Sequence, residues 1–299
     1  MWAAQRALLS GGRWHFQHGP IDLILVAEGD VAALAAAHAA AWARFQPLLA
    51  ELVAELPLLR QPVDADADCR LQGAVAQRMW AACAPLRTAA DGFITPMAAV
   101  AGAVAQELIA HYQRPGITRA WVNNGGDIAL HLAPGQSARV GLVADLSRFD
   151  ADALARTAAG NLRTDAGFTV AHASPVRGVA TSGWRGRSHS LGIADSVTVL
   201  AATAAAADAA ATVVANAVNL DDARIHRAPA SSLRDDSDLG DRLVTVAVPP
   251  LPAVAVQQAL QAGLHLARQL QAQGLVHAVL LACQGSLARL APVGALELV

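Results

Sequence analysis

The alanine-rich segment 197–218 constrains the fold most, because it has to be buried somewhere. Its sequence, VTVLAATAAAADAAATVVANAV, carries a single charge, at Asp208. Alanine is a strong helix former but a poor membrane anchor, and a carboxylate within lipid is costly. The segment therefore predicts a short strand followed by a buried helix, over about 204–219, in a soluble protein.

The composition supports an ordered core and excludes several partners. The chain has 299 residues, 54% of them hydrophobic and 15% charged, with a net charge of −2. A near-neutral chain gives no electrostatic basis for binding nucleic acid or an anionic membrane. It contains no lysine, so all of its basic side chains other than histidine are arginines. Three scattered cysteines match no disulfide framework or metal motif, which predicts a cytoplasmic location.

Helices and strands alternate along the chain without a regular βαβ repeat, and this order favours a mixed α+β fold. Asp30 is expected to cap a long helix that Pro47 ends or kinks. Thr95, followed by Pro96, is expected to cap the next helix. The charged stretch 221–242 is expected to form a polar surface loop.

A glycine turn between two predicted strands is the first candidate site. The strand 117–122 leads into the sequence NNGGD, which contains Asn123, Gly125, Gly126 and Asp127. Two glycines permit positive φ angles and leave backbone amides available to a phosphate, while Asp127 could accept a hydrogen bond from a ribose or ring donor. The alternative is an ordinary hairpin turn, for which Asn-Gly is a strong signal.

A second candidate lies at the end of a later strand. Thr181, Ser182 and Gly183 offer two hydroxyls and a glycine that could bind a phosphate or a carbonyl. The alternative is a strand end that simply carries turn residues. Arg185 and Arg187 follow closely and could pair with an anion, or could be exposed loop residues without a specific role.

The third candidate lies within the alanine-rich helix. Asp208 and Thr212 are four residues apart and therefore share one helix face. A carboxylate and a hydroxyl are hard oxygen ligands that suit Mg²⁺. A buried carboxylate without a partner is expensive, which argues for a role of Asp208, whereas Thr212 could bond to its own helix. Asn216 and Asn219 extend the same polar stripe.

In this order, the segments resemble the ApbE-like superfamily of FAD:protein FMN transferases, and more closely its UPF0280 branch. The resemblance is clearest over 95–248. It rests on the phrases TPMAAVAGAVA, VNNGGDIAL, GVATSGWRGRSHSLGIADS, ADAAAT and DSDLGDRLVTV. It implies an α+β, T-fold-like architecture with two lobes in a single domain spanning 1–299.

The resemblance also implies a function. FAD would be bound by Asn123, Gly125, Gly126, Asp127, Thr181, Ser182 and Gly183, and Mg²⁺ by Asp208 and Thr212. A threonine or serine hydroxyl of an acceptor protein would attack the FAD pyrophosphate, so that FMN is attached and AMP leaves. The expected partners are thus a flavin nucleotide and an acceptor protein, and a homodimer is a further expectation for an apolar chain of this size.

The sequence departs from the transferase pattern upstream of the glycine turn. Ala101 occupies the position of the family's lysine, Gly102 is retained, and Gln106 stands where an acidic residue is expected. Two alternatives to a transferase therefore stay open. One is a flavin- or nucleotide-binding or assembly protein without transferase activity, and the other is an enzyme that acts on another phosphorylated substrate. No residue is assigned a catalytic role.

Overall fold

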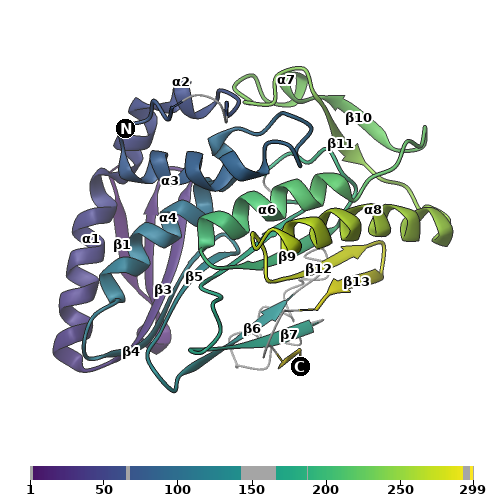
Figure 1. Cartoon of the computed structure of the whole chain (residues 1–299). Helices are drawn as coiled ribbons and strands as arrows, with labels where there is room; N and C mark the ends of the chain where they lie inside the picture. Colours follow the sequence, from purple (N-terminus) through teal and green to yellow (C-terminus); the bar gives the residue numbers. More distant parts are fainter. Residues whose placement is uncertain (1–2, 65–67, 143–165, 187, 292–296, 299) are drawn as a thin grey trace.

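The computed structural model describes residues 3–64, 68–142, 166–186, 188–291 and 297–298. A large antiparallel sheet runs through the described part of the molecule, with helices layered over it (Figure 1). In spatial order its nine described strands are β1 (Gln5–Leu8), β2 (Trp14–His18), β3 (Ile21–Gly29), β4 (Ile117–Asn124), β5 (Asp127–Leu132), β8 (Gly178–Ser182), β9 (Ser196–Ala201), β12 (Ala278–Cys283) and β13 (Ser286–Leu290).

The two faces of this sheet bury different cores, because successive side chains along a strand point to opposite sides. In β9, Val199 packs into the main core beneath the helices, whereas Leu200 belongs to a smaller core on the other face. In β12, Leu281 and Ala278 divide in the same way. A small sheet of β6 (Ser137–Leu142), β7 (Ala166–Ala171) and β14 (Glu297–Leu298) contributes to the smaller core.

The helical layer includes elements from both halves of the chain. The longer helices are α1 (Val31–Ala54), α3 (Ala74–Cys83), α4 (Val100–Ile109), α6 (Ala204–Ala217) and α8 (Ala253–Ala272). The short ones are α2 (Leu56–Leu59), α7 (Ala230–Leu233), η1 (Ser10–Gly12), η2 (Ala84–Leu86), η3 (Pro96–Ala99) and η4 (Ala110–Tyr112). Among the described residues, no helix combines the length and apolar character needed to cross a bilayer.

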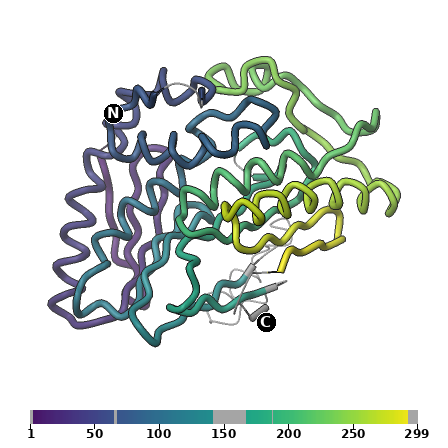
Figure 2. Tube along the Cα trace, in the orientation of Figure 1, coloured from purple at the N-terminus to yellow at the C-terminus, as the bar shows by residue number. Residues whose placement is uncertain are grey.

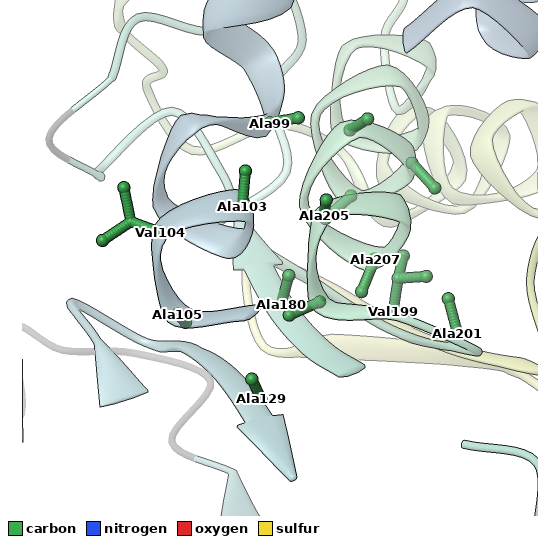
Figure 3. Packing of buried hydrophobic residues seen from close by; sticks show 14 of the residues in the cluster. Ala99, Ala103, Val104, Ala105, Ala129, Ala180, Val199, Ala201, Ala205 and Ala207 are labelled. Atoms are coloured by element: carbon green, nitrogen blue, oxygen red, sulfur yellow. The ribbon is translucent and has the colours of Figure 1, made fainter. Parts of the chain in front are cut away.

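The alanine-rich helix predicted from the sequence is α6, and it is buried against α4 and the central strands. Figure 3 shows Ala103 on α4 and Ala205 on α6 close to Ala180 of β8. A Cβ atom on Gly102 would lie 2.2 Å from the carbonyl oxygen of Ala204. Small residues thus let the two helices approach until their backbones nearly touch, and this contact brings α4 beside Asp208.

The helix that was expected after Asp30 is α1. Of the two effects expected from Pro47, ending the helix is wrong: α1 continues to Ala54, and its buried residues Phe45 and Leu48 lie on both sides of the proline. Core packing therefore holds the helix through a position where one backbone hydrogen bond is missing. Asp30 occupies the N-cap position of α1, but its side chain makes no capping hydrogen bond.

The segment 221–242 contains regular structure as well as polar turns. It includes β10 (His226–Pro229), which pairs with β11 (Leu243–Ala247), and the short helix α7. Its second half, 230–242, is closed at its ends, since the Ala230 amide donates to the carbonyl of Arg242. This segment lies beside the N-terminal half of the helical layer (Figure 1).

Candidate functional site

The NNGGD sequence forms the tight turn that was predicted between two strands. Asn124 and Asp127 face each other across the end of β4 and β5, and the two glycines between them have φ angles of 65° and 116°. The Gly126 amide donates to Oδ1 of Asn123 over 2.8 Å. Positive φ angles favour glycine, so both Gly125 and Gly126 are required by the backbone of this turn.

The second predicted segment lies next to this turn. The amide of Thr181, near the end of β8, donates to Oδ1 of Asp127 over 3.1 Å. Asp127 is 9% exposed, so its carboxylate is held at a buried position by the backbone of the neighbouring strand. The Thr181 hydroxyl lies 2.9 Å from that of Thr198 on β9, and Ser182 ends β8. Two of the three predicted segments therefore meet at one end of the sheet.

Asp208 is brought to the same place by α6. Its Oδ2 accepts a hydrogen bond from the Gly102 amide over 2.8 Å. Burial and the negative charge of Asp127 raise the pKa of Asp208 well above its ordinary value, while the backbone amides of Gly102 and Ala101 act in the opposite direction. Two carboxylates from distant parts of the sequence thus share one poorly solvated location, where a cation would be favourable.

One buried amide in this region was missed by sequence reasoning. Asn124 is 4% exposed, and its Nδ2 donates to the carbonyl oxygen of Ala101 over 3.1 Å. It therefore connects the glycine turn to the start of α4, where Gly102 binds Asp208. The alternation of side chains along the strand is the sequence signal for this residue. Asn124 lies an even number of positions from Ala120 and Val122 and therefore shares their buried side of β4.

The polar stripe along α6 divides into two parts. Asn216 accepts hydrogen bonds from the Ser190 hydroxyl and the Leu191 amide, and Asn219 donates to the Leu191 carbonyl. These asparagines hold the loop before β9 and do not extend the candidate site. Thr212 is partly buried, and its hydroxyl makes no hydrogen bond in the described part of the chain, so it remains available one turn beyond Asp208.

The loop after β8 has its own internal contacts. A Cβ atom on Gly183 would lie 2.4 Å from the carbonyl oxygen of Asp195, so this glycine permits a close backbone approach. Arg185 lies over the ring of Trp184, and its Nε is 3.2 Å from Oδ1 of Asp195. Arg187 lies outside the described residues. The expectation that Arg185 pairs with a bound anion therefore competes with an ion pair inside the loop.

The donor set suits a metal that keeps few protein ligands. No group of three or more histidine, cysteine, aspartate or glutamate side chains converges as a metal cage within the described residues. Magnesium is often bound through one or two carboxylates, with water and substrate phosphates completing its shell. Asp208 and the available Thr212 hydroxyl fit that requirement, and a bound cation would relieve the repulsion from Asp127. Magnesium binding remains a prediction.

These features define the class of protein, an ApbE-like α+β fold with a glycine turn and a partly buried carboxylate on the facing helix. The family model described as "AbpE bacteria" matches residues 6–290, and the chain belongs to this family. The crystal structure of the ApbE protein from Thermotoga maritima aligns over 97% of both chains, with a TM-score of 0.51 and 11% identity. The α+β fold and the family resemblance expected from the sequence are thus confirmed.

Two archaeal relatives share a more limited region. A UPF0280 protein from Methanothermobacter thermautotrophicus is 40% identical over 127 residues, which is 42% of this chain and 43% of the relative. A UPF0280 protein from Methanopyrus kandleri is 40% identical over 136 residues, which is 45% of this chain and 48% of the relative. The chain spans less than half the length of these relatives.

Proposed function

We propose that the protein binds FAD, or a related ligand with a pyrophosphate, together with Mg²⁺. The observation that carries this proposal is the meeting of Asp208 with Asp127 beside the glycine turn, although 81 positions separate them along the chain. A pair of carboxylates that is largely removed from water, one buried and one partly buried, is costly without a cation. The family's known chemistry, as implied by the sequence resemblance, supplies both the cation and the diphosphate.

In this proposal, backbone amides orient the two carboxylates, and α6 provides the groups that hold the metal. The amide of Gly102 orients Asp208, and the amide of Thr181 orients Asp127. Asp208 and Thr212 would hold Mg²⁺ from one face of α6. When bound, the metal would neutralise charge on the pyrophosphate. The turn at Gly125 would then lie next to the flavin nucleotide without a side chain in its way.

Transfer of FMN to a threonine or serine hydroxyl of an acceptor protein is the finer proposal. In that reaction the hydroxyl oxygen forms a new bond to the FMN phosphorus, the pyrophosphate bond breaks, and AMP leaves. The chain provides no ammonium group to assist, because Ala101 occupies the lysine position and the sequence has no lysine. This observation favours a second candidate, a flavin- or nucleotide-binding protein without transferase activity.

Ligand binding is tested by titrating FAD, followed by flavin fluorescence, in Mg²⁺ and in EDTA. We expect Asp208→Ala to weaken the Mg²⁺-dependent binding by about 2–4 kcal/mol, the scale for losing a charged contact. Asp30→Ala is the matched control, since Asp30 makes no side-chain capping bond and lies at the start of α1. Equal Mg²⁺-dependent affinities in wild type and Asp208→Ala would contradict the proposal.

The transferase step is tested separately. The protein is incubated with FAD, Mg²⁺ and candidate acceptor proteins, and the acceptors are weighed as intact chains while AMP is measured. An acceptor that gains the mass of FMN less one water, together with release of AMP, supports transfer. Binding of FAD without either product supports the non-catalytic alternative. Binding of another phosphorylated compound in preference to FAD supports a different substrate.

A further inference from the structure

A threonine expected to cap a helix is used differently in this fold. Thr95 occupies the N-cap position before Pro96, yet its side chain caps nothing. Its hydroxyl instead donates to Oδ2 of Asp238, which is 143 residues further along the chain. Thr95 is 3% exposed and Asp238 is partly exposed, so this hydrogen bond connects two distant segments at a partly buried position.

Asp238 belongs to a closed segment that we call the strap, residues 230–242. The strap is attached to the N-terminal half of the molecule at three points. Arg60 pairs with Asp236 over 2.8 Å, Arg242 lies 3.5 Å from the centroid of the Phe93 ring, and Asp238 holds Thr95. Of these three contacts, the one to Thr95 adjoins the helix that carries Gly102.

The thiol of Cys83 is influenced both by the strap and by the candidate site. This thiol donates to the carbonyl oxygen of Thr95 over 3.3 Å. Burial raises the pKa of this thiol, and the charges of Asp208 and Asp238 raise it further. The charge of one carboxylate on α6 and that of one in the strap therefore act on the same buried thiol.

The connection continues from Thr95 to the site through a short path. Thr95 leads directly into η3 and α4, and the Ala98 amide donates to its carbonyl oxygen. The amide of Gly102, on the first turn of α4, then binds Asp208. Seven residues thus separate Thr95, which is bonded to the strap, from Gly102, whose amide is bonded to Asp208.

We propose that Asp238 is a positioning residue, which through its hydrogen bond to Thr95 sets the start of α4 and thereby the orientation of Asp208. The proposal rests on the proposed function for its effect on ligand binding, but not for its effect on α4. It gives the strap a role in the site although the strap contributes no ligand to it.

The test compares variants that remove the hydrogen bond with variants that keep it. Thr95→Val and Asp238→Ala remove it, whereas Thr95→Ser keeps the hydroxyl and Asp238→Asn keeps an acceptor. Arg60→Ala is the matched control, because it releases the strap at another point. The readouts are hydrogen exchange of the backbone amides in 96–106 and the dissociation constant for FAD in Mg²⁺.

We expect faster exchange over 96–106 in Thr95→Val and Asp238→Ala, and near wild-type exchange in Thr95→Ser, Asp238→Asn and Arg60→Ala. We also expect the FAD dissociation constant to rise about 10-fold in the first two, the scale of one charged hydrogen bond. The double variant Thr95→Val/Asp238→Ala should be no weaker than either single variant, since both remove one interaction.

Three outcomes would overturn the inference. The first is unchanged exchange over 96–106 in Asp238→Ala, and the second is an equal change in Arg60→Ala, which would indicate general loosening of the strap. Faster exchange with an unaltered FAD dissociation constant would separate Asp238 from the site and would also refute it. If the wild-type chain binds no FAD, the proposed function fails, and the exchange measurement alone decides whether the pair fixes α4.

Discussion

Two partly buried carboxylates of this protein, Glu107 and Asp208, have pKa values that move in opposite directions, and their neighbours explain the difference. Burial raises the pKa of Glu107, but hydrogen bonds from Arg44 and Arg78 outweigh burial and lower it. Asp208 receives only backbone amides and faces another carboxylate, so its pKa rises. A paired acid of the first kind stabilises the fold, whereas an acid of the second kind is typical of a site that awaits a cation.

The pH dependence of stability should reveal this property of Asp208. Between its ordinary pKa of 3.8 and its raised pKa, the folded state binds more protons than the unfolded state. The free energy of unfolding contributed by Asp208 therefore falls as the pH rises through that range. We expect the difference between wild type and Asp208→Ala, measured by urea unfolding, to decline over the same range.

Magnesium should oppose the decline of the free energy of unfolding with rising pH, because it binds the ionised carboxylate of Asp208. Added Mg²⁺ should therefore raise the melting temperature of the wild type at neutral pH and leave that of Asp208→Ala unchanged. An identical pH profile in both proteins would show that the Asp208 carboxylate has its ordinary pKa, and the site prediction would lose its main support.

The sequence revealed only part of the network around Asp208. The acid was conspicuous because it lies among alanines, and Asp127 because it follows two glycines. Asn124 and Asp238 were not singled out, since an asparagine beside a turn and an aspartate in a charged stretch are common on surfaces. Their roles depend on contacts to Ala101 and Thr95, which are distant in the sequence.

Among the elements, the contact between α4 and α6 is the one that positions the site. It depends on Gly102, since a methyl group there would lie 2.2 Å from the Ala204 carbonyl oxygen and 2.8 Å from Cβ of Asp208. Helix formation was predictable from the alanine content. The close approach of these two helices was not, because small residues permit a close contact without specifying which helix makes it.

We expect Gly102→Ala to destabilise the protein by about 2–3 kcal/mol, because rigid backbone atoms must move. The gain in helix propensity, about 1 kcal/mol, offsets only part of this cost. Gly263→Ala on α8 is the matched control. There a methyl group would meet chiefly the side chains of Val218 and Leu281 and no backbone carbonyl, so a smaller loss is expected.

Thermal or urea unfolding of both variants provides the measurement. A loss in Gly263→Ala as large as that in Gly102→Ala would contradict the argument that backbone contact at α4 and α6 is the critical feature. Binding of FAD in Mg²⁺ should weaken in Gly102→Ala and not in Gly263→Ala, because only the first change lies beside Asp208.

At the scale of the whole molecule, three helices of the N-terminal half are joined by one ion cluster. Glu107 on α4 accepts from Arg44 on α1 over 2.7 Å and from Arg78 on α3 over 2.8 Å. Its side chain is 15% exposed, so water screens these pairs weakly. Arg44 also pairs with Glu51, whose side chain is 45% exposed.

Loss of the Glu107 charge should therefore lower the free energy of unfolding more than loss of the Glu51 charge. We expect Glu107→Gln to lower the free energy of unfolding by about 2 kcal/mol at pH 7 and Glu51→Gln by less than about 1 kcal/mol. Because the pKa of Glu107 is lowered from 4.5, its contribution is present above that value and is lost as the pH falls through the lowered pKa.

Urea unfolding at pH 7 and under acid conditions measures this difference. The difference in free energy of unfolding between wild type and Glu107→Gln should shrink as the pH falls. The corresponding difference for Asp208→Ala should instead grow as the pH falls. A gap for Glu107→Gln that persists unchanged in acid would show that packing, and not charge, accounts for the loss.

The α+β class and most strands were predictable from hydrophobic alternation and turn residues, but the order of strands was not. Adjacent strands in the sequence, such as β4 and β5, are joined by a turn that the sequence marks clearly. The pairing of β5 with β8 follows no local signal, because β6 and β7 intervene and form a separate sheet. Long-range pairing of this kind is decided by the packing of the whole core.

The pairing of β5 with β8 joins the two halves of the main sheet, and it is short. Only Ile128 with Val179 and Ala129 with Gly178 are in register there, and Figure 2 shows the early and late parts of the chain on either side. The hydrogen bond from the Thr181 amide to the Asp127 carboxylate adds one further link between β8 and β5. A nucleotide bound at that end of the sheet would contact both halves and stabilise the short β5–β8 pairing between them. Ligand occupancy and the resistance of the sheet to separation at this pairing would then increase together.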